Sequence, residues 1–133
     1  MKGNSFIDSN ICIYLFDSDK KKSDIAYSLF KNNPIISTQV IAESINVLIK
    51  KLKFTKQTAF DSANFIMNNT DIKLINTTTL KKAFEISLKY NFSFFDSMII
   101  ASALENNCTI LYSEDMHHNQ LIENKLTIIN PFL

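Results

Sequence analysis

Glycine and arginine are almost missing from this chain. Its 133 residues include a single glycine, Gly3, and every one of its 14 basic residues is a lysine. Phosphate-binding loops and dinucleotide-binding turns need several glycines, because glycine lets the backbone approach a phosphate closely. The sequence therefore excludes both kinds of nucleotide site.

An excess of charge of one sign is also lacking. Fourteen basic residues against 13 acidic ones give a formal net charge of +1, which provides no overall electrostatic attraction to nucleic acid. A contact with nucleic acid would have to depend on local lysine clusters. There are two such clusters, for each of which a solvated surface is the alternative: Lys20, Lys21 and Lys22, and Lys50, Lys51, Lys53 and Lys56.

Cysteine and histidine are scarce. The two cysteines, Cys12 and Cys108, lie far apart in apolar segments and form no C-x-x-C pair, so we expect free, buried thiols in a reducing cytoplasm. His117 and His118 are the only histidines, and two His with two Cys offer no zinc-ligand spacing. We expect both histidines in a solvated loop; contact with RNA phosphates or acid–base chemistry is the alternative.

Long apolar runs are missing as well. No stretch reaches the roughly 18 apolar residues of a membrane span, and the N-terminus lacks the apolar block of a signal peptide. We therefore expect a cytoplasmic protein without a membrane segment. Linkers and repeats are also lacking, while 46% of the residues are hydrophobic, so residues 1–133 are predicted to form a single domain with a substantial core.

Short apolar runs alternate with helical patterns along the chain. Strands are predicted at residues 5–8, 35–37, 72–75, 109–113 and 126–130. A short helix is predicted to begin at residue 11, and a second to span 21–33 with Ser23 as N-cap. A longer helix is predicted from Thr38, as its cap, to about Lys53. Three more helices are predicted at 55–69, at 78–91 and in the segment headed by Asp96. The alternation predicts a three-layer α/β fold, in which helices cover both faces of a parallel sheet of about four or five strands.

Two acids follow predicted strands, at the carboxyl edge where sites form in α/β folds. Asp8 ends the first strand in "FIDSN", and Asp115 follows the strand "TILYS". The alternative for Asp8 is a helix N-cap, and for Asp115 a solvated loop acid. Glu114 is a competing candidate beside Asp115.

Two further acids lie on predicted helices. Glu43 sits at the edge of an apolar stripe in "TQVIAESINVL", with a solvent-exposed carboxylate as the alternative. Asp96 shares a helix face with Ile99 and Ile100. The alternative for Asp96 is specific, because Ser93 and Asp96 have the spacing of a capping box.

These four acids are more informative as a set than singly, because all of them could converge on one edge of the sheet. Two carboxylates 4 Å apart repel by about 4 kcal/mol at an effective dielectric constant of about 20, so four together need a counter-charge. A hard divalent cation such as Mg²⁺ or Mn²⁺ provides it, since these ions prefer carboxylate and water oxygens. Hydrolysis of a phosphodiester suits such a cluster, the metal activating water and stabilising the developing charge.

Three segments in this order resemble the PIN-domain ribonucleases, and in particular the VapC-like toxins of toxin–antitoxin systems. They are "FIDSNICIYLF", "STQVIAESINVL" and "FSFFDSMIIASALENNCTILYSEDMHHNQ", and the ending "IINPF" also resembles a subgroup of these proteins. One departure is Asn119, where similar proteins often have glycine. Asparagine tolerates the left-handed backbone better than most residues do, so the loop need not be broken.

The resemblance implies a role for seven residues. Asp8, Glu43, Asp96 and Asp115 match the metal-binding, catalytic carboxylates. Asn10 and Ser113 match polar positions around the site, and Ser97 does so less securely.

It also implies an activity and partners. The expected activity is Mg²⁺- or Mn²⁺-dependent endoribonuclease cleavage of RNA, and the expected partners are a cognate antitoxin and a second copy of the chain in a homodimer. A PIN-type nuclease in RNA processing or DNA cleavage, and a non-catalytic nucleic-acid-binding adaptor, are the alternatives.

Overall fold

In the computed structural model, which describes residues 4–133, six strands form one sheet in the order β3-β2-β1-β4-β6-β5. The strands are β1 (Ser5–Ile7), β2 (Ile35–Ser37), β3 (Asp71–Lys73), β4 (Ile110–Tyr112), β5 (Leu121–Ile122) and β6 (Leu126–Ile129). All neighbours pair in parallel except β5, which pairs antiparallel with β6. The predicted parallel sheet is confirmed, and β5 is a short addition to it.

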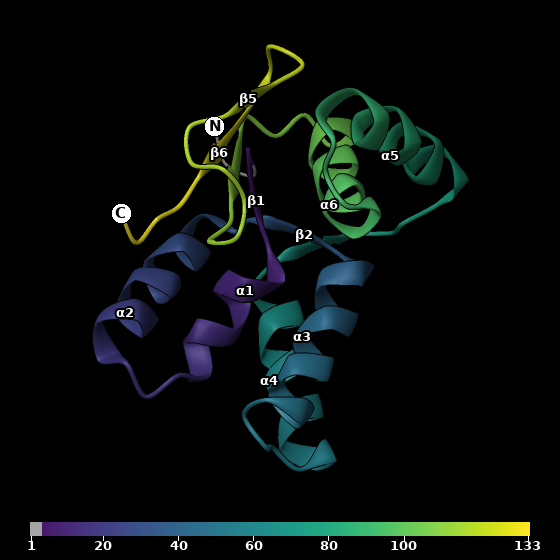
Figure 1. Cartoon of the computed structure of the whole chain (residues 1–133). Helices are drawn as coiled ribbons and strands as arrows, with labels where there is room; N and C mark the ends of the chain where they lie inside the picture. The colour runs from purple at the N-terminus through teal and green to yellow at the C-terminus, as the bar shows by residue number, and fades with distance from the viewer. Residues whose placement is uncertain (1–3) are drawn as a thin grey trace.

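Six α-helices cover the two faces of this sheet. They are α1 (Ser9–Cys12), α2 (Lys20–Leu29), α3 (Thr38–Lys50), α4 (Lys56–Asn68), α5 (Thr77–Tyr90) and α6 (Phe94–Glu105), with short 3-10 turns at Ile13–Phe16 and Phe30–Asn32. The pair α5 and α6 lies on one side of the sheet, and α1 to α4 lie on the other (Figure 1). The predicted three-layer α/β fold is therefore confirmed.

Two of the predicted helix N-caps were wrong, and the first and last helices begin two residues earlier than predicted, at Ser9 and Phe94. The N-cap of α2 is Asp19, whose side chain accepts a hydrogen bond from the backbone N–H of Lys22, and Ser23 lies inside the helix. The N-cap of α3 is Ser37 rather than Thr38, and this helix ends at Lys50, before the predicted Lys53. In both cases the chain offers two adequate capping side chains close together, and the apolar pattern does not choose between them.

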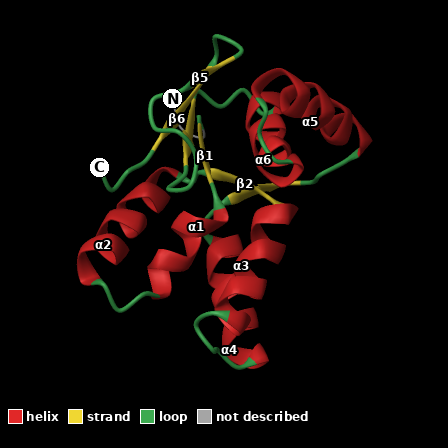
Figure 2. Cartoon of the chain, viewed as in Figure 1, coloured by secondary structure: helices red, strands yellow, loops and turns green. Residues whose placement is uncertain are grey.

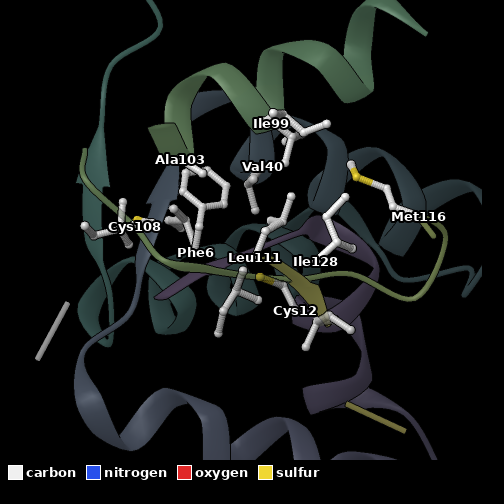
Figure 3. Packing of buried hydrophobic residues seen from close by; sticks show 14 of the residues in the cluster. Phe6, Cys12, Val40, Ile99, Ala103, Cys108, Leu111, Met116 and Ile128 are labelled. Atoms are coloured by element: carbon white, nitrogen blue, oxygen red, sulfur yellow. The ribbon is translucent and has the colours of Figure 1, made fainter. Parts of the chain in front are cut away.

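The core fills the space between the sheet and its helices. Residues from β1, β4 and β6, among them Phe6, Leu111 and Ile128, pack with Val40 of α3 and Ile99 of α6 (Figure 3). Both cysteines are free and buried, as expected. Within residues 4–133, none of the helices has the length and apolar character that crossing a membrane requires.

The order of the strands brings two distant parts of the chain together. β1 lies between β2 and β4, so the chain leaves β1 toward one side of the sheet and returns through β4 on the other. β1 and β2 lead almost directly into α1 and α3 (Figure 2). A crevice at such a switch point, beyond the carboxyl ends of the strands, is where ligands bind in open α/β sheets.

Candidate functional site

Asp8 occupies this switch point, between β1 and α1, with only 5% of its surface exposed. It is the N-cap of α1, because its Oδ1 accepts a hydrogen bond of 2.7 Å from the backbone N–H of Ser9. Its other oxygen, Oδ2, accepts one of 2.9 Å from the hydroxyl of Ser113, just after β4. Asp8 therefore combines the capping role with a position that faces the other acids.

Asn10 connects Asp8 to Asp115. Its Nδ2 lies 3.0 Å from Oδ2 of Asp115 and 3.4 Å from Oδ2 of Asp8. Its Oδ1 accepts a hydrogen bond of 3.2 Å from the backbone N–H of Glu114. A single amide thus fixes the loop after β4 relative to the end of β1.

The structure distinguishes Glu114 from Asp115. The Glu114 carboxylate is directed to the Tyr14 hydroxyl, at 2.6 Å, and to the Lys22 ammonium, at 3.1 Å. The hydrogen bonds that Lys22 donates to the Tyr14 hydroxyl and to the Glu114 carboxylate raise the pKa of Lys22 to about 12, so Lys22 remains a cation. Glu114 is therefore neutralised within the chain, whereas Asp115 faces Asn10.

Glu43 reaches the same place from α3. Its Oε1 accepts a hydrogen bond of 3.2 Å from the Ser9 hydroxyl, and its Oε2 accepts one of 3.1 Å from Nε2 of Gln39. The same Gln39 nitrogen donates to the backbone carbonyl of Phe95, at 3.0 Å. Gln39 therefore holds α3 against the start of α6, one residue before Asp96.

Asp96 is the third residue of α6. The Ser93 hydroxyl, which caps this helix, accepts a hydrogen bond of 3.1 Å from the backbone N–H of Asp96. Burial, and after it the negative charge of Asp115, raise the pKa of the Asp96 carboxyl above its ordinary value. The backbone N–H of Asp96 thus takes part in capping the helix, while its carboxyl interacts electrostatically with Asp115.

The pKa of the Asp8 carboxyl is strongly raised. Burial raises its pKa from 3.8 to about 7, with smaller contributions in the same direction from the charges of Glu43 and Asp96. The hydrogen bonds from Ser113 and Ser9 act in the opposite direction but do not offset burial. In residues 4–133, no ion pair involves any of the four acids. The cluster therefore lacks a counter-charge of its own.

The chemistry of these side chains fits a hard divalent cation. As the side chains stand, no group of three or more Asp, Glu, His or Cys residues within the described part of the chain forms a metal cage. Mg²⁺ does not require one, because it commonly binds through one or two carboxylates and keeps several waters. A buried carboxylate that forms no ion pair and lies near the negative charges of Glu43 and Asp96 is the kind of donor that a divalent cation stabilises.

Three other residues considered in the sequence analysis are Ser97, His117 and His118. Ser97 is fully buried, and its hydroxyl has no hydrogen-bond partner among residues 4–133, so its predicted supporting role stays a prediction. His117 is exposed, whereas Nδ1 of His118 accepts a hydrogen bond of 2.9 Å from the backbone N–H of Asn130. The imidazole of His118 thus anchors the chain after β6.

Sequence reasoning missed Ser9 and Gln39, which hold the Glu43 carboxylate. A signal for Gln39 was present, because it lies four residues before Glu43 and so on the same face of the helix. Ser9 gave no comparable signal, since its partner in α3 is 34 residues away in sequence.

Comparisons with known proteins support a fold assignment. The family model described as PIN domain matches residues 5–123. No curated protein sequence matches the chain. Three solved structures resemble it along most of their length, and at 16%, 17% and 20% identity they establish the fold alone.

The three structures come from bacteria. VapC20 of Mycobacterium tuberculosis, a toxin that cleaves the sarcin–ricin loop, has a TM-score of 0.69 and 16% identity, over 84% of this chain and 89% of that one. A toxin–antitoxin complex from Klebsiella pneumoniae has a TM-score of 0.72 and 17% identity, over 96% and 97%. VapBC2 of Rickettsia felis, bound to a DNA fragment from its promoter, has a TM-score of 0.68 and 20% identity, over 93% and 96%.

Proposed function

Because this chain belongs to the PIN domain family, whose members are typically nucleases, we propose that it is a metal-dependent endoribonuclease that hydrolyses phosphodiester bonds of RNA. The observation that carries the proposal is the environment of Asp8. Its buried carboxyl has a pKa of about 7, lies near the charges of Glu43 and Asp96, and forms no ion pair with a cationic side chain of residues 4–133. Such an arrangement costs stability unless a cation binds there.

We assign the metal-binding and catalytic role to Asp8, Glu43, Asp96 and Asp115, with Mg²⁺ or Mn²⁺ as the ion. When bound, the ion supplies a water activated for attack on phosphorus and stabilises the charge that develops on the phosphate oxygens. Four neutral side chains orient the acids for this purpose through the hydrogen bonds described above: Ser9, Asn10, Gln39 and Ser113. Of these, Asn10 and Ser113 were predicted to support the site.

We also propose that the protein is the toxin of a toxin–antitoxin pair and acts in the cytoplasm. Two of the similar structures are complexes of such pairs, and the third is a toxin. The antitoxin would then be a second partner besides RNA. The free, buried thiols of Cys12 and Cys108 suit a reducing compartment.

A second copy of the chain is the third proposed partner. The apolar face, which we define as Phe84, Leu88, Phe94 and Phe95, is exposed along α5 and the start of α6. The Phe84 and Phe94 rings lie 5.7 Å apart between centroids, and 87% of Leu88 is exposed. Contiguous exposed apolar side chains of this size mark interaction surfaces.

Charge favours a second copy as the occupant of this face. Lys81 and Glu85 are exposed on α5, one turn from Phe84 or Leu88, and neither forms an ion pair within the described chain. Opposite charges that flank one apolar surface are what a two-fold interface needs, because the same patch must complement itself.

The test of the proposed function is cleavage of RNA by the purified protein. We expect cleavage with Mg²⁺ or Mn²⁺ and none with EDTA. Asp96→Asn should lower the rate by more than about 100-fold, since loss of an outer-shell partner alone costs about 10- to 100-fold. Asp61→Asn is the matched control, because Asp61 is an exposed acid on α4 that bonds only Gln57.

Four outcomes distinguish the alternatives. Cleavage that survives both EDTA and Asp96→Asn would refute the metal mechanism. RNA binding without cleavage under any metal condition would favour a nucleic-acid-binding adaptor. Growth arrest on expression, relieved by a co-expressed antitoxin, distinguishes a toxin from a housekeeping nuclease, and cleavage of DNA under the same conditions would broaden the substrate.

A further inference from the structure

The loop between α3 and α4, with the helix ends that flank it, carries a dense group of positive charges. Four lysines lie within seven residues, and we call them the lysine tip: Lys50, Lys51, Lys53 and Lys56. All four are exposed, and none forms an ion pair within residues 4–133. Glu43 and Asp61 are the nearest acids along the chain on either side. The tip is thus a concentrated patch of positive charge on a protein whose net charge is only +1.

The backbone holds this patch in one conformation. The backbone N–H of Lys51 donates to the carbonyl of Val47 at 2.8 Å, and that of Phe54 donates to the carbonyl of Leu48 at 3.0 Å. Thr55 then caps α4 by accepting a hydrogen bond from the N–H of Thr58 at 3.1 Å. The four lysine backbones are therefore fixed relative to α3, which also carries Glu43.

Two of these lysines occupy positions where lysine is an unfavourable choice. Lys53 has a φ of 62°, in the left-handed region, and five of the other six described residues with positive φ are asparagines, which accept it more readily. Lys56 is the first residue of α4, where the helix dipole disfavours a cation. Lys50 and Lys51, at the end of α3, suit the dipole. The stability of the loop therefore does not explain why lysine occurs at all four positions of the lysine tip.

The lysine tip is connected to the acidic cluster along one side of α3. Lys50 lies seven residues after Glu43, which places the two on the same face of the helix, about 10 Å apart along its axis. Ala42, Asn46 and Lys50 form an exposed row at intervals of four residues beside Glu43. The α3–α4 pair extends away from the sheet, with the tip at its far end (Figure 1). Between Glu43 and the tip, α3 itself carries no acidic side chain, so an RNA strand that follows this helix meets none on it.

We propose that the lysine tip binds the phosphate backbone of the substrate RNA beyond the bond that is cut. This inference deepens the proposed nuclease function and rests on it. Repulsion between the four acids and RNA phosphates must be offset outside the metal site, and closely spaced lysines bind a backbone without regard to base sequence. The tip thus adds affinity and directs the strand along α3, while the acids carry the chemistry.

The test is RNA binding by an Asp96→Asn background that leaves the RNA intact. The tip variant combines Lys50→Gln, Lys51→Gln, Lys53→Asn and Lys56→Gln; asparagine at residue 53 suits the left-handed backbone. The matched control removes the same charge at four exposed lysines outside the tip and outside the apolar face, through Lys20→Gln, Lys21→Gln, Lys31→Gln and Lys125→Gln. Among these four, Lys20 alone pairs with an acid, the exposed Asp24. The probe is a single-stranded RNA of about 12 nucleotides, a length that a protein groove covers.

We expect the tip variant to bind this RNA about tenfold or more weakly at low salt. Each phosphate contact on a single strand contributes about 0.7 to the slope of log affinity against log salt, so the slope should become shallower by about 2 to 3. The control variant should retain both the affinity and the slope. A dinucleotide, which is too short to reach from Glu43 to the tip, should bind all variants equally.

A further variant with arginine at the four tip positions guards against a folding artefact, because it keeps the charge and should restore binding. Equal losses in the tip and control variants would overturn the proposal, since only net charge would then matter. Unchanged RNA affinity in the tip variant would also overturn the proposal. The same holds if the tip variant binds RNA normally but no longer binds a protein partner. Tip-dependent binding without any cleavage by the wild type would leave the proposal standing and refute the nuclease function.

Discussion

At the scale of single residues, Asp8 opposes the stability of the protein that contains it. Its folded-state pKa of about 7 lies above its ordinary value of 3.8 because it is buried. The folded state therefore holds the Asp8 proton more tightly than the unfolded state does. The protonated carboxyl of Asp8 therefore stabilises the folded state relative to the ionised one. This stabilisation is complete below about pH 3.8 and is lost as the pH rises through about 7, where Asp8 ionises in the folded protein.

This linkage predicts a pH dependence for the metal-free protein. With EDTA present, the contribution of Asp8 to the free energy of unfolding should fall by about 3 kcal/mol between pH 5 and pH 8. Asp8→Asn removes the titrating group but keeps an oxygen that can cap α1, so it should be more stable than the wild type at pH 8. Urea unfolding of both proteins at each pH measures the difference. Parallel pH profiles would contradict the assignment.

Metal binding should show the opposite preference. A cation binds the ionised carboxylate, so divalent-ion affinity should weaken as the pH falls below about 7. The residue that costs the metal-free protein stability is then the one that the metal needs.

The sequence predicted which acids approach one another better than it predicted their partners. Asp8 and Asp115 follow parallel strands, and the carboxyl ends of such strands share one edge of the sheet. The choice between Glu114 and Asp115 stayed open, because both are polar residues of one loop. In the structure Tyr14 and Lys22 bind the Glu114 carboxylate, and these two residues are 100 and 92 residues away from it in sequence, a separation at which no local pattern is informative.

At the scale of elements, helix starts are decided by individual hydrogen bonds. The predicted N-cap Ser23 lies inside α2, where its hydroxyl donates to the carbonyl of Lys20. Asp19 forms the actual cap. Both residues precede or begin the same apolar pattern, so periodicity predicted the helix and left its start undetermined.

These two residues give a matched test. Asp19→Ala should lower the free energy of unfolding by about 1 kcal/mol, because an orphan N–H in the first turn loses its acceptor. Ser23→Ala should change it by less than about 0.5 kcal/mol, since serine inside a helix contributes no cap and alanine is the better helix former. Denaturant unfolding measures both values. A larger loss for Ser23→Ala would restore the original prediction.

The strands show a similar limit. β5 was missed because two residues, Leu121 and Ile122, are too few to display an alternating pattern. It pairs with β6, whose own prediction came from the longer apolar run 126–130. Only the five strands of three or four residues were visible in the sequence.

At the scale of the whole molecule, the apolar face predicts the oligomeric state. Leu88→Glu should shift a homodimer toward monomer, because it places a charge at the centre of the proposed interface. The fold should survive, since Leu88 is 87% exposed. Light scattering after size exclusion, over a range of concentrations, measures the effect. Leu133→Glu is the control, because Leu133 is 83% exposed and lies outside the apolar face; equal effects of the two substitutions would contradict the interface.

The distribution of the site along the chain has a consequence in time. Asp8 depends on Ser113, and the backbone N–H of Ser113 is held at 3.0 Å by the carbonyl of Ile129 in β6. A ribosome adds about 5–20 residues per second, so roughly ten seconds separate the synthesis of Asp8 from that of Ile129. Throughout that interval the growing chain has acids but no assembled site. The proposed nuclease therefore becomes active in one late step, and its own messenger RNA is translated by ribosomes that carry only inert chains.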